Sequence, residues 1–180
     1  TTSQSSAASD VYKRQTQTLH GLGYRNVVGL DLSAKMVSRG LKIHPHIDLK
    51  TATSEWWPGR PESFDVVILF AVLTCIPTQT GQEKLLAQIE HVLRPGGILY
   101  ISDYWLQEDD RNLDRYRAFE KKYGIYGVFE LAEGAVFRHH ERPWMRSLLS
   151  RFATLHLDDI QVTTMNGHPS LGFQYFGKKA

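Results

Sequence analysis

The stretch FDVVILFAVL, Phe64 to Leu73, is the strongest strand signal in this chain of 180 residues. It is apolar on both faces of an extended backbone, and only Asp65 interrupts it. Strands that are buried on both faces are typical of parallel sheets covered by helices on either side. The stretch therefore predicts a central strand of an α/β protein.

Two shorter signals precede this stretch. VVGLD, residues 27–31, is a Val-rich run typical of a buried parallel strand, and IDLKTAT, residues 47–53, alternates weakly as a second strand would. Between them, Ser33 offers a helix N-cap and Gly40 is expected to end that helix.

Helix and strand alternate again after the central strand. Thr80 and Glu83 match a T-x-x-E capping box at the start of a helix. The helix repeats apolar residues at helical spacing up to RPGG, residues 94–97, which ends it. ILYISDY, residues 98–104, is the next buried strand, so the order predicts parallel strands with right-handed crossovers.

The last third of the chain does not continue the alternation of strand and helix. A long excursion, residues 105–140, contains an expected helix with Leu113, Tyr116, Phe119 and Tyr123 on one face. Pro143 is expected at the first turn of another helix, which would carry Trp144, Met145, Leu148, Leu149 and Phe152. Two strands joined around Asn166-Gly167 would close the chain as a hairpin.

Composition narrows the class of protein. The chain has 21 Lys and Arg against 19 Asp and Glu, a net charge of +2, and its basic residues are scattered. This balance argues against nucleic-acid and membrane partners, and no apolar run is long enough to span a bilayer. The lone Cys75 suits a reducing cytoplasm and is interpreted as a small buried hydrophobe. We expect a cytoplasmic protein.

The first fifteen residues, TTSQSSAASDVYKRQ, show no apolar periodicity. They predict a disordered leader, or an artefact, since SAASDVYKRQ resembles a translated sequencing-adapter read-through. A native flexible tail is the alternative. Structured sequence is expected from Thr16, in one domain that covers residues 16–180.

Three segments resemble the class I S-adenosylmethionine-dependent methyltransferases. VVGLDLSAKMV resembles that family's second strand with its acidic end, FDVVILFAVLTCIP its fourth strand, and HVLRPGGILYISDY the turn into its fifth. The resemblance implies a Rossmann-like, doubly wound, mostly parallel sheet with an antiparallel last strand, in the order 3-2-1-4-5-7-6. It makes residues 105–140 an insertion on the substrate side.

The family's glycine loop follows a strand and opens a helix. Gly21-Leu22-Gly23 does neither, because it precedes a strand at the point where a helix should end, so we interpret it as a helix C-cap. The family's first strand and glycine loop are then missing, and the domain resembles an amino-terminally truncated methyltransferase. We expect such a chain to be poorly stable and to bind its cofactor weakly.

The resemblance implies a set of residues that bind S-adenosylmethionine. Asp31 would accept hydrogen bonds from the ribose hydroxyls, with a helix-cap role as the alternative. Leu32 and Met36 would pack near the adenine, although Met36 could equally be core. Glu55 and Trp56 would lie near the adenine; the alternative is that Glu55 is a solvated carboxylate and Trp56 part of the core. The backbone of Phe70, Ala71 and Val72 would face the methionine part.

Polar residues on the substrate side follow from topology, because ligands bind beyond the carboxyl ends of parallel strands. Tyr104 ends a strand there, and His139, His140 and His168 are expected at the same edge. A histidine could orient the substrate, act as a general base, or have no catalytic duty. Adjacent histidines point apart in extended chain, so no metal site is expected.

The expected reaction is methyl transfer from S-adenosylmethionine to a small-molecule nucleophile. It depends chiefly on alignment and desolvation, so a dedicated base is not required. One alternative is a non-catalytic, truncated fragment that acts as a binding or dimerising module. A nicotinamide-dependent dehydrogenase is a second alternative, against which the LRPGG turn and the closing hairpin argue. The sequence identifies neither the acceptor nor the oligomeric state.

Overall fold

The computed structural model describes residues 15–52, 60–164 and 167–180. The chain divides into two compact units, Thr1–Pro58 and Gly59–Ala180, and each is described by itself. Its strands form three sheets, in the orders β1-β2, β3-β4-β8-β7 and β5-β6.

The first unit opens with a helix over residues 15–21 that ends at the glycine pair. The Tyr24 amide donates to the Leu19 carbonyl (3.1 Å) and the Gly23 amide to the His20 carbonyl (3.1 Å). This is the pair of bonds that defines a Schellman C-cap, and Gly23 has the left-handed φ of 97° that it needs. The interpretation of Gly21-Leu22-Gly23 as a helix terminus is confirmed.

Two parallel strands and one helix complete the described part of this unit. β1 (Val28–Asp31) pairs in parallel with β2 (Asp48–Thr51), and α2 (Ala34–Ile43) connects them. Ser33 is the N-cap as predicted, since its hydroxyl accepts from the Met36 amide. The prediction that Gly40 ends the helix is wrong. Gly40 is buried inside α2, where an interior glycine costs only about 1 kcal/mol.

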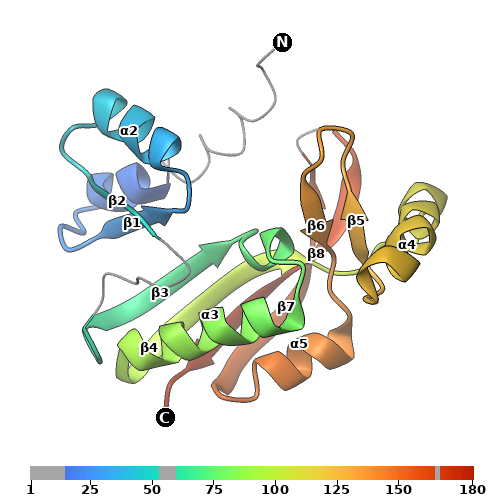
Figure 1. Ribbon diagram of the computed structural model, residues 1–180. Coiled ribbons are helices and arrows are strands. Elements are labelled where there is room, and N and C mark those ends of the chain that lie inside the picture. The colour runs from blue at the N-terminus through green and yellow to red at the C-terminus, as the bar shows by residue number, and fades with distance from the viewer. Residues whose placement is uncertain (1–14, 53–59, 165–166) are drawn as a thin grey trace. The chain divides into compact units, whose positions relative to one another are not determined.

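The second unit is built on a four-stranded mixed sheet (Figure 1). β3 (Phe64–Phe70) is parallel to β4 (Leu93–Tyr104), while β8 (Pro169–Lys178) is antiparallel to both β4 and β7 (Ala153–Thr163). In the family's strand numbering, β2 and β1 correspond to strands 3 and 2, and β3, β4, β8 and β7 correspond to strands 4, 5, 7 and 6. The two observed orders therefore match the two ends of the predicted order 3-2-1-4-5-7-6. The α/β class and the antiparallel last strand are confirmed.

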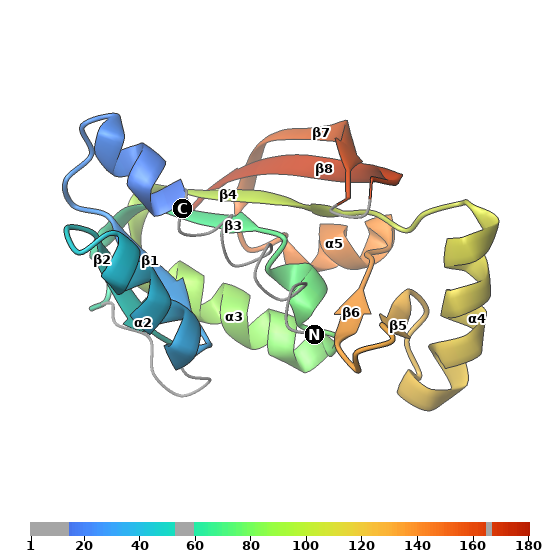
Figure 2. The ribbon, with the colours of Figure 1, turned by 90° about the horizontal axis from the view of Figure 1, so that it is seen from above.

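Helices α3 (Gln79–Val92) and α5 (Arg142–Leu148) cover one face of this sheet (Figures 1 and 2). The core lies between them and the strands, and its fully buried side chains include Leu86, Ile89, Leu99, Ile101 and Phe173. The predicted capping box at Thr80 and Glu83 is wrong, because the N-cap is Thr78, whose hydroxyl accepts from the Gly81 amide. α3 ends at Val92, before RPGG, as predicted.

The central-strand prediction is only partly right. β3 ends at Phe70 rather than Leu73, and a short 3-10 helix, η1 (Leu73–Cys75), follows. Val66 and Ile68 are 47% and 39% exposed, so β3 is not buried on both faces. Among the described strands only β4 pairs with β3, which makes β3 an edge strand of its sheet.

The excursion after β4 forms a helix and a small hairpin at one end of the sheet (Figure 2). α4 (Asp110–Tyr123) begins at the N-cap Asp109 and ends at Gly124, which has a left-handed φ of 66°. This confirms the predicted helix, whereas the hairpin of β5 (Val128–Glu130) and β6 (Val136–Arg138) was not predicted. No helix in the described parts of the chain is long and apolar enough to cross a membrane.

The closing elements agree with most of the prediction. Pro143 lies in the first turn of α5, but Leu149 is the C-cap and Phe152 follows it, so neither belongs to the helix as predicted. β7 and β8 form the predicted hairpin, and the Gly167 amide donates to the Thr164 carbonyl (2.8 Å) at its turn. Met165 and Asn166 lie outside the described residues.

Candidate active site

In the first unit, Asp31 ends β1 with its carboxylate half-buried. Its Oδ1 accepts from the Ser33 amide (2.7 Å), an Asx turn that orients the group, and Oδ2 has no hydrogen bond with the described residues. Leu32 is 74% exposed and Met36 is half-buried. The structure thus presents a fixed carboxylate next to accessible apolar surface at a strand end.

In the second unit, Phe70, Ala71 and Val72 lie at the carboxyl end of β3 and are half-buried. Ala71 has a φ of 50°, which is uncommon for a residue with a side chain and is typical of functional turns. Its amide donates to the Ser102 carbonyl in β4 (2.8 Å). Glu55 and Trp56 lie outside the described residues, and their role stays a prediction.

Asp103 is a buried anchor near the end of β4. Its Oδ2 accepts from the Thr74 amide (3.2 Å), its Oδ1 accepts from the Tyr104 amide (2.8 Å), and Nε2 of His140 lies 3.5 Å from Oδ1. Because the side chain of Asp103 is inaccessible, it fixes the loop after β3 against the end of β4 and does not meet a ligand.

Tyr116 and His139 form a buried polar pair in the excursion. The Tyr116 hydroxyl lies 2.5 Å from Nδ1 of His139, and the Gln107 amide donates to the same hydroxyl (3.2 Å). Burial, helped by the nearby Arg115, lowers the pKa of His139 to about 3, and burial raises the pKa of Tyr116 to about 12. Both groups are therefore neutral near pH 7.

The ring of Tyr104 also lies next to that of His139. The centroids of the two rings are 5.5 Å apart, and the Tyr104 side chain is half-buried. Burial and the adjacent Asp103 raise the pKa of Tyr104, so its phenol also stays protonated at neutral pH. Of the predicted catalytic candidates, the structure brings Tyr104 and His139 together.

Arg115 places a positive charge next to this pair. Its guanidinium carbon lies 3.6 Å from the centroid of Phe129, and the His139 ring contacts the same Phe129 at 5.0 Å between centroids. No carboxylate of the described residues lies within 4.0 Å of Arg115, its Nε is buried without a partner, and burial lowers its pKa. Sequence reasoning missed Arg115, because an arginine on a helix is ordinarily a solvated residue.

Arg138 is a second arginine that no sequence pattern singles out. It is 1% exposed, its Nη1 donates to the Pro77 carbonyl (3.4 Å), and its guanidinium lies 5.0 Å from the Trp144 ring centroid. The Thr74 hydroxyl donates to the Arg138 carbonyl (2.8 Å). These contacts bind the loop after β3 to the end of the excursion.

The remaining predicted polar residues separate. His139 turns to Tyr116 and His140 to Asp103, so the two histidines do point apart, and His168 is exposed. No three His, Cys, Asp or Glu side chains in these parts could hold a metal ion. Cys75 is exposed, with its thiol donating to the Ala71 carbonyl (3.4 Å), so the prediction that it is buried is wrong.

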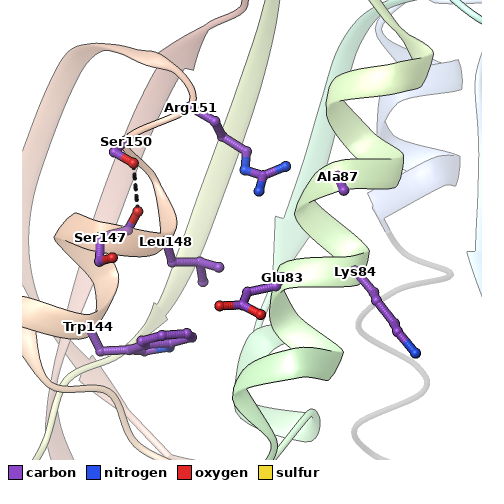
Figure 3. Close-up of a pocket in the computed structure, with 8 residues that line it drawn as sticks. All are labelled: Glu83, Lys84, Ala87, Trp144, Ser147, Leu148, Ser150 and Arg151. Carbon is purple, nitrogen blue, oxygen red and sulfur yellow. Dashed lines mark hydrogen bonds between the residues drawn. The ribbon is translucent and has the colours of Figure 1, made fainter.

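Two hollows accompany these residues. One of about 440 Å³ lies between α3 and α5, where Glu83, Trp144 and Arg151 face it, and no predicted site residue lines it (Figure 3). A second, of about 330 Å³, includes Gln107, Asp109 and Leu171 and therefore borders the segment that donates to Tyr116. Tyr116 and His139 line neither hollow.

Comparison with known proteins gives a family match. The model of a methyltransferase domain matches residues 12–101, which is half of the chain. The phthiotriol/phenolphthiotriol dimycocerosates methyltransferase 1 of Mycobacterium ulcerans is 36% identical over 90 residues. That match covers 49% of this chain and 31% of the relative, so the chain spans less than a third of the relative's length.

Solved structures agree on the fold. A methyltransferase of Methanosarcina mazei that depends on S-adenosylmethionine has a TM-score of 0.79 at 19% identity, covering 85% of this chain and 81% of that one. The 1,6-didemethyltoxoflavin-N1-methyltransferase of Burkholderia thailandensis, solved with S-adenosylhomocysteine bound, has a TM-score of 0.60 at 17% identity, covering 93% of this chain and 66% of that one. The Rossmann-like fold is therefore confirmed.

Proposed function

Because the chain belongs to the class I methyltransferases, we propose that it catalyses transfer of a methyl group from S-adenosylmethionine to a small-molecule nucleophile. The observation that carries this proposal is Asp31, whose carboxylate is held at the carboxyl end of a parallel strand with one oxygen unengaged by the described residues. An acidic residue at this place accepts the ribose hydroxyls in nucleotide-binding sheets.

The residues present fit the cofactor. The ribose needs acceptors, which Asp31 offers, and the adenine needs apolar surface, which the exposed Leu32 and half-buried Met36 supply. At the end of β3, the left-handed Ala71 turns the backbone where the resemblance expects the methionine part. Because Asp31 and Ala71 lie in different units, each supports the proposal separately.

S-adenosylmethionine, when bound, supplies a methyl group whose carbon–sulfur bond breaks with both electrons left on sulfur. This chain has to hold an acceptor in line and remove water from it. We infer that Tyr104 and His139 contact the acceptor, since they lie together beyond the end of β4. Asp103 and Arg138 act as positioning residues, because both are buried and bind the loop after β3.

The two alternatives are less well supported. A nicotinamide-dependent dehydrogenase would need a different family match. A non-catalytic binding module would keep the fold without the cofactor, and the expected weak binding makes this the alternative to test.

The test is a calorimetric titration of S-adenosylhomocysteine into the 180-residue chain and two variants. Asp31→Ala should weaken binding by about tenfold or more, the effect of losing hydrogen bonds to a charged group. Asp48→Ala is the matched control, because Asp48 is an exposed carboxylate on the neighbouring strand that pairs with Lys50. Absence of binding by the unaltered chain, or equal binding by both variants, would overturn the proposal.

A further inference from the structure

We propose that the methyl acceptor is an acidic hydroxyl compound, of which a phenol is the simplest example, bound as its anion beside His139 and Arg115. The inference rests on the proposed methyl transfer and adds the chemical class of the acceptor. It is carried by the hydrogen bonds of Tyr116 and by the unpaired charge of Arg115.

The hydrogen bonds around Tyr116 fix the proton of His139. The Tyr116 oxygen accepts from the Gln107 amide and lies next to the Arg115 guanidinium, which has only donors. The single hydroxyl hydrogen must then point to Nδ1 of His139, which makes Nδ1 an acceptor and puts the ring hydrogen on Nε2. Nε2 has no partner among the described residues, and unlike the ring nitrogens of His140 it is not fully buried.

His139 is therefore a hydrogen-bond donor and a poor base. Its Nε2 already carries a proton, and the buried, cationic surroundings oppose the addition of another. Tyr104 and Tyr116 are protonated at neutral pH and cannot accept a proton either. An acceptor that contacts these residues finds no base among them, which favours one that is already an anion.

The charges around His139 favour an anion. Arg115 and Arg111 both act on His139 and Asp109 opposes them, while the buried Asp103 acts on the neighbouring Tyr104. Asp109 is already engaged, because it caps α4 through Asn112 and lies 3.8 Å from Nε of Arg111. Arg115 hydrogen-bonds Tyr116 and interacts with Asp109 at longer range, but no carboxylate of the described residues lies within 4.0 Å of it, so no ion pair engages its charge.

The reaction balances for such an acceptor. A lone pair of the acceptor oxygen forms the bond to the methyl carbon while the carbon–sulfur pair stays on sulfur. The oxygen anion and the sulfonium cation become a neutral ether and a neutral thioether. No proton is released, so the step needs no base.

The probe for this inference is 4-nitrophenol, whose phenolate absorbs visible light, with 4-nitroaniline as the neutral isostere. The chain should bind the phenolate in preference to the aniline and lower the apparent pKa of the bound phenol. Arg115→Gln should weaken phenolate binding about tenfold, which is the effect of losing one charge-assisted hydrogen bond. It should leave aniline binding unchanged. Arg117→Gln is the matched control, since Arg117 is exposed on the same helix and paired with Asp114.

A second pair of variants tests the donor. His139→Gln keeps an N–H group and should retain phenolate binding within about threefold, whereas His139→Met should lose about tenfold. Circular dichroism checks that each variant folds, and a variant that does not fold is replaced by its partner at the same position. These readouts move only if the side chain meets the anion, because a purely structural role would change both probes alike.

The outcomes separate the two proposals. Equal binding of phenol and aniline, or no effect of Arg115→Gln, would overturn the inference. Binding of phenolate without binding of S-adenosylhomocysteine would support the anion site and overturn the proposed methyl transfer. Binding of S-adenosylhomocysteine without phenolate would do the reverse.

Discussion

The hydroxyl of Tyr116 lies 2.5 Å from Nδ1 of His139, although 23 residues separate them in the chain. α4 supplies the tyrosine and the end of the β5–β6 hairpin supplies the histidine. The contact therefore ties the two halves of the excursion together and sets which ring nitrogen of His139 carries hydrogen.

Tyr116→Phe should remove the hydrogen bond that sets the tautomer of His139. The variant keeps the buried ring but removes the donor to Nδ1, so His139 should populate both neutral tautomers, and stability should fall by about 1 kcal/mol. Nitrogen NMR shifts of the His139 ring measure the tautomer directly. Tyr123→Phe removes a hydroxyl from the same helix, one that contacts Glu130 instead, and should leave those shifts unchanged. Unchanged shifts in Tyr116→Phe would contradict the assignment.

Acid should destabilise the second unit through His139. Burial lowers the pKa of His139 from 6.5 to about 3. Between pH 6.5 and pH 3 the unfolded chain therefore binds a proton at His139 that the folded chain does not bind. The stability is complete above pH 6.5 and is lost as pH falls, by about 2 kcal/mol between pH 8 and pH 5. Urea unfolding at several pH values measures this slope, and His139→Leu should lack that share of it. Parallel curves for the two proteins would refute the prediction.

Much of the fold followed from local sequence signals. The Schellman end at Gly23, the N-cap at Ser33 and the hairpin at Gly167 each depend on residues within one turn of each other. Gly40 misled because burial against neighbouring elements outweighs the small helix penalty of glycine. Thr78 and Thr80 are both good N-caps, and Thr78 is the one with the extended backbone of a cap and a hydroxyl that accepts from the Gly81 amide.

The site was less predictable, for a physical reason. Tyr104 and His139 were selected because topology places strand ends at one edge. Arg115 and Arg138 carry no such signal, since an arginine is usually solvated and only tertiary packing makes these two buried or unpaired. The partner of His139 could not be named from spacing, because the pairing depends on how α4 folds back onto the hairpin.

The exposed face of β3 gives a third prediction. Val66→Thr and Ile68→Thr should each change the unfolding free energy by less than about 0.5 kcal/mol, because both side chains are exposed in the structure. Leu69→Ala is the comparison, since Leu69 is 5% exposed on the same strand and should cost about 2–5 kcal/mol. Urea unfolding measures all three. A loss above about 2 kcal/mol for Ile68→Thr would mean that this face is covered in solution.

Gly127 holds the backbone of His139 at close range. The His139 amide donates to the Gly127 carbonyl (2.9 Å), and a Cβ added at Gly127 would lie 2.5 Å from the His139 carbonyl oxygen. Its φ of 91° adds strain for any residue with a side chain. Gly134 has a similar φ of 87° but nothing within 4 Å of an added Cβ. Alanine at position 134 therefore meets the backbone strain without the steric clash.

Gly134→Ala should therefore cost about 1 kcal/mol, the penalty of a left-handed alanine. Gly127→Ala should cost about 3 kcal/mol, because strain and overpacking add. It should also shift the His139 ring signals and weaken phenolate binding, while Gly134→Ala leaves both unchanged. Urea unfolding and NMR of His139 measure these effects. Equal losses in the two variants would show that the backbone at Gly127 yields without moving His139, and the close approach would then have no part in positioning the site.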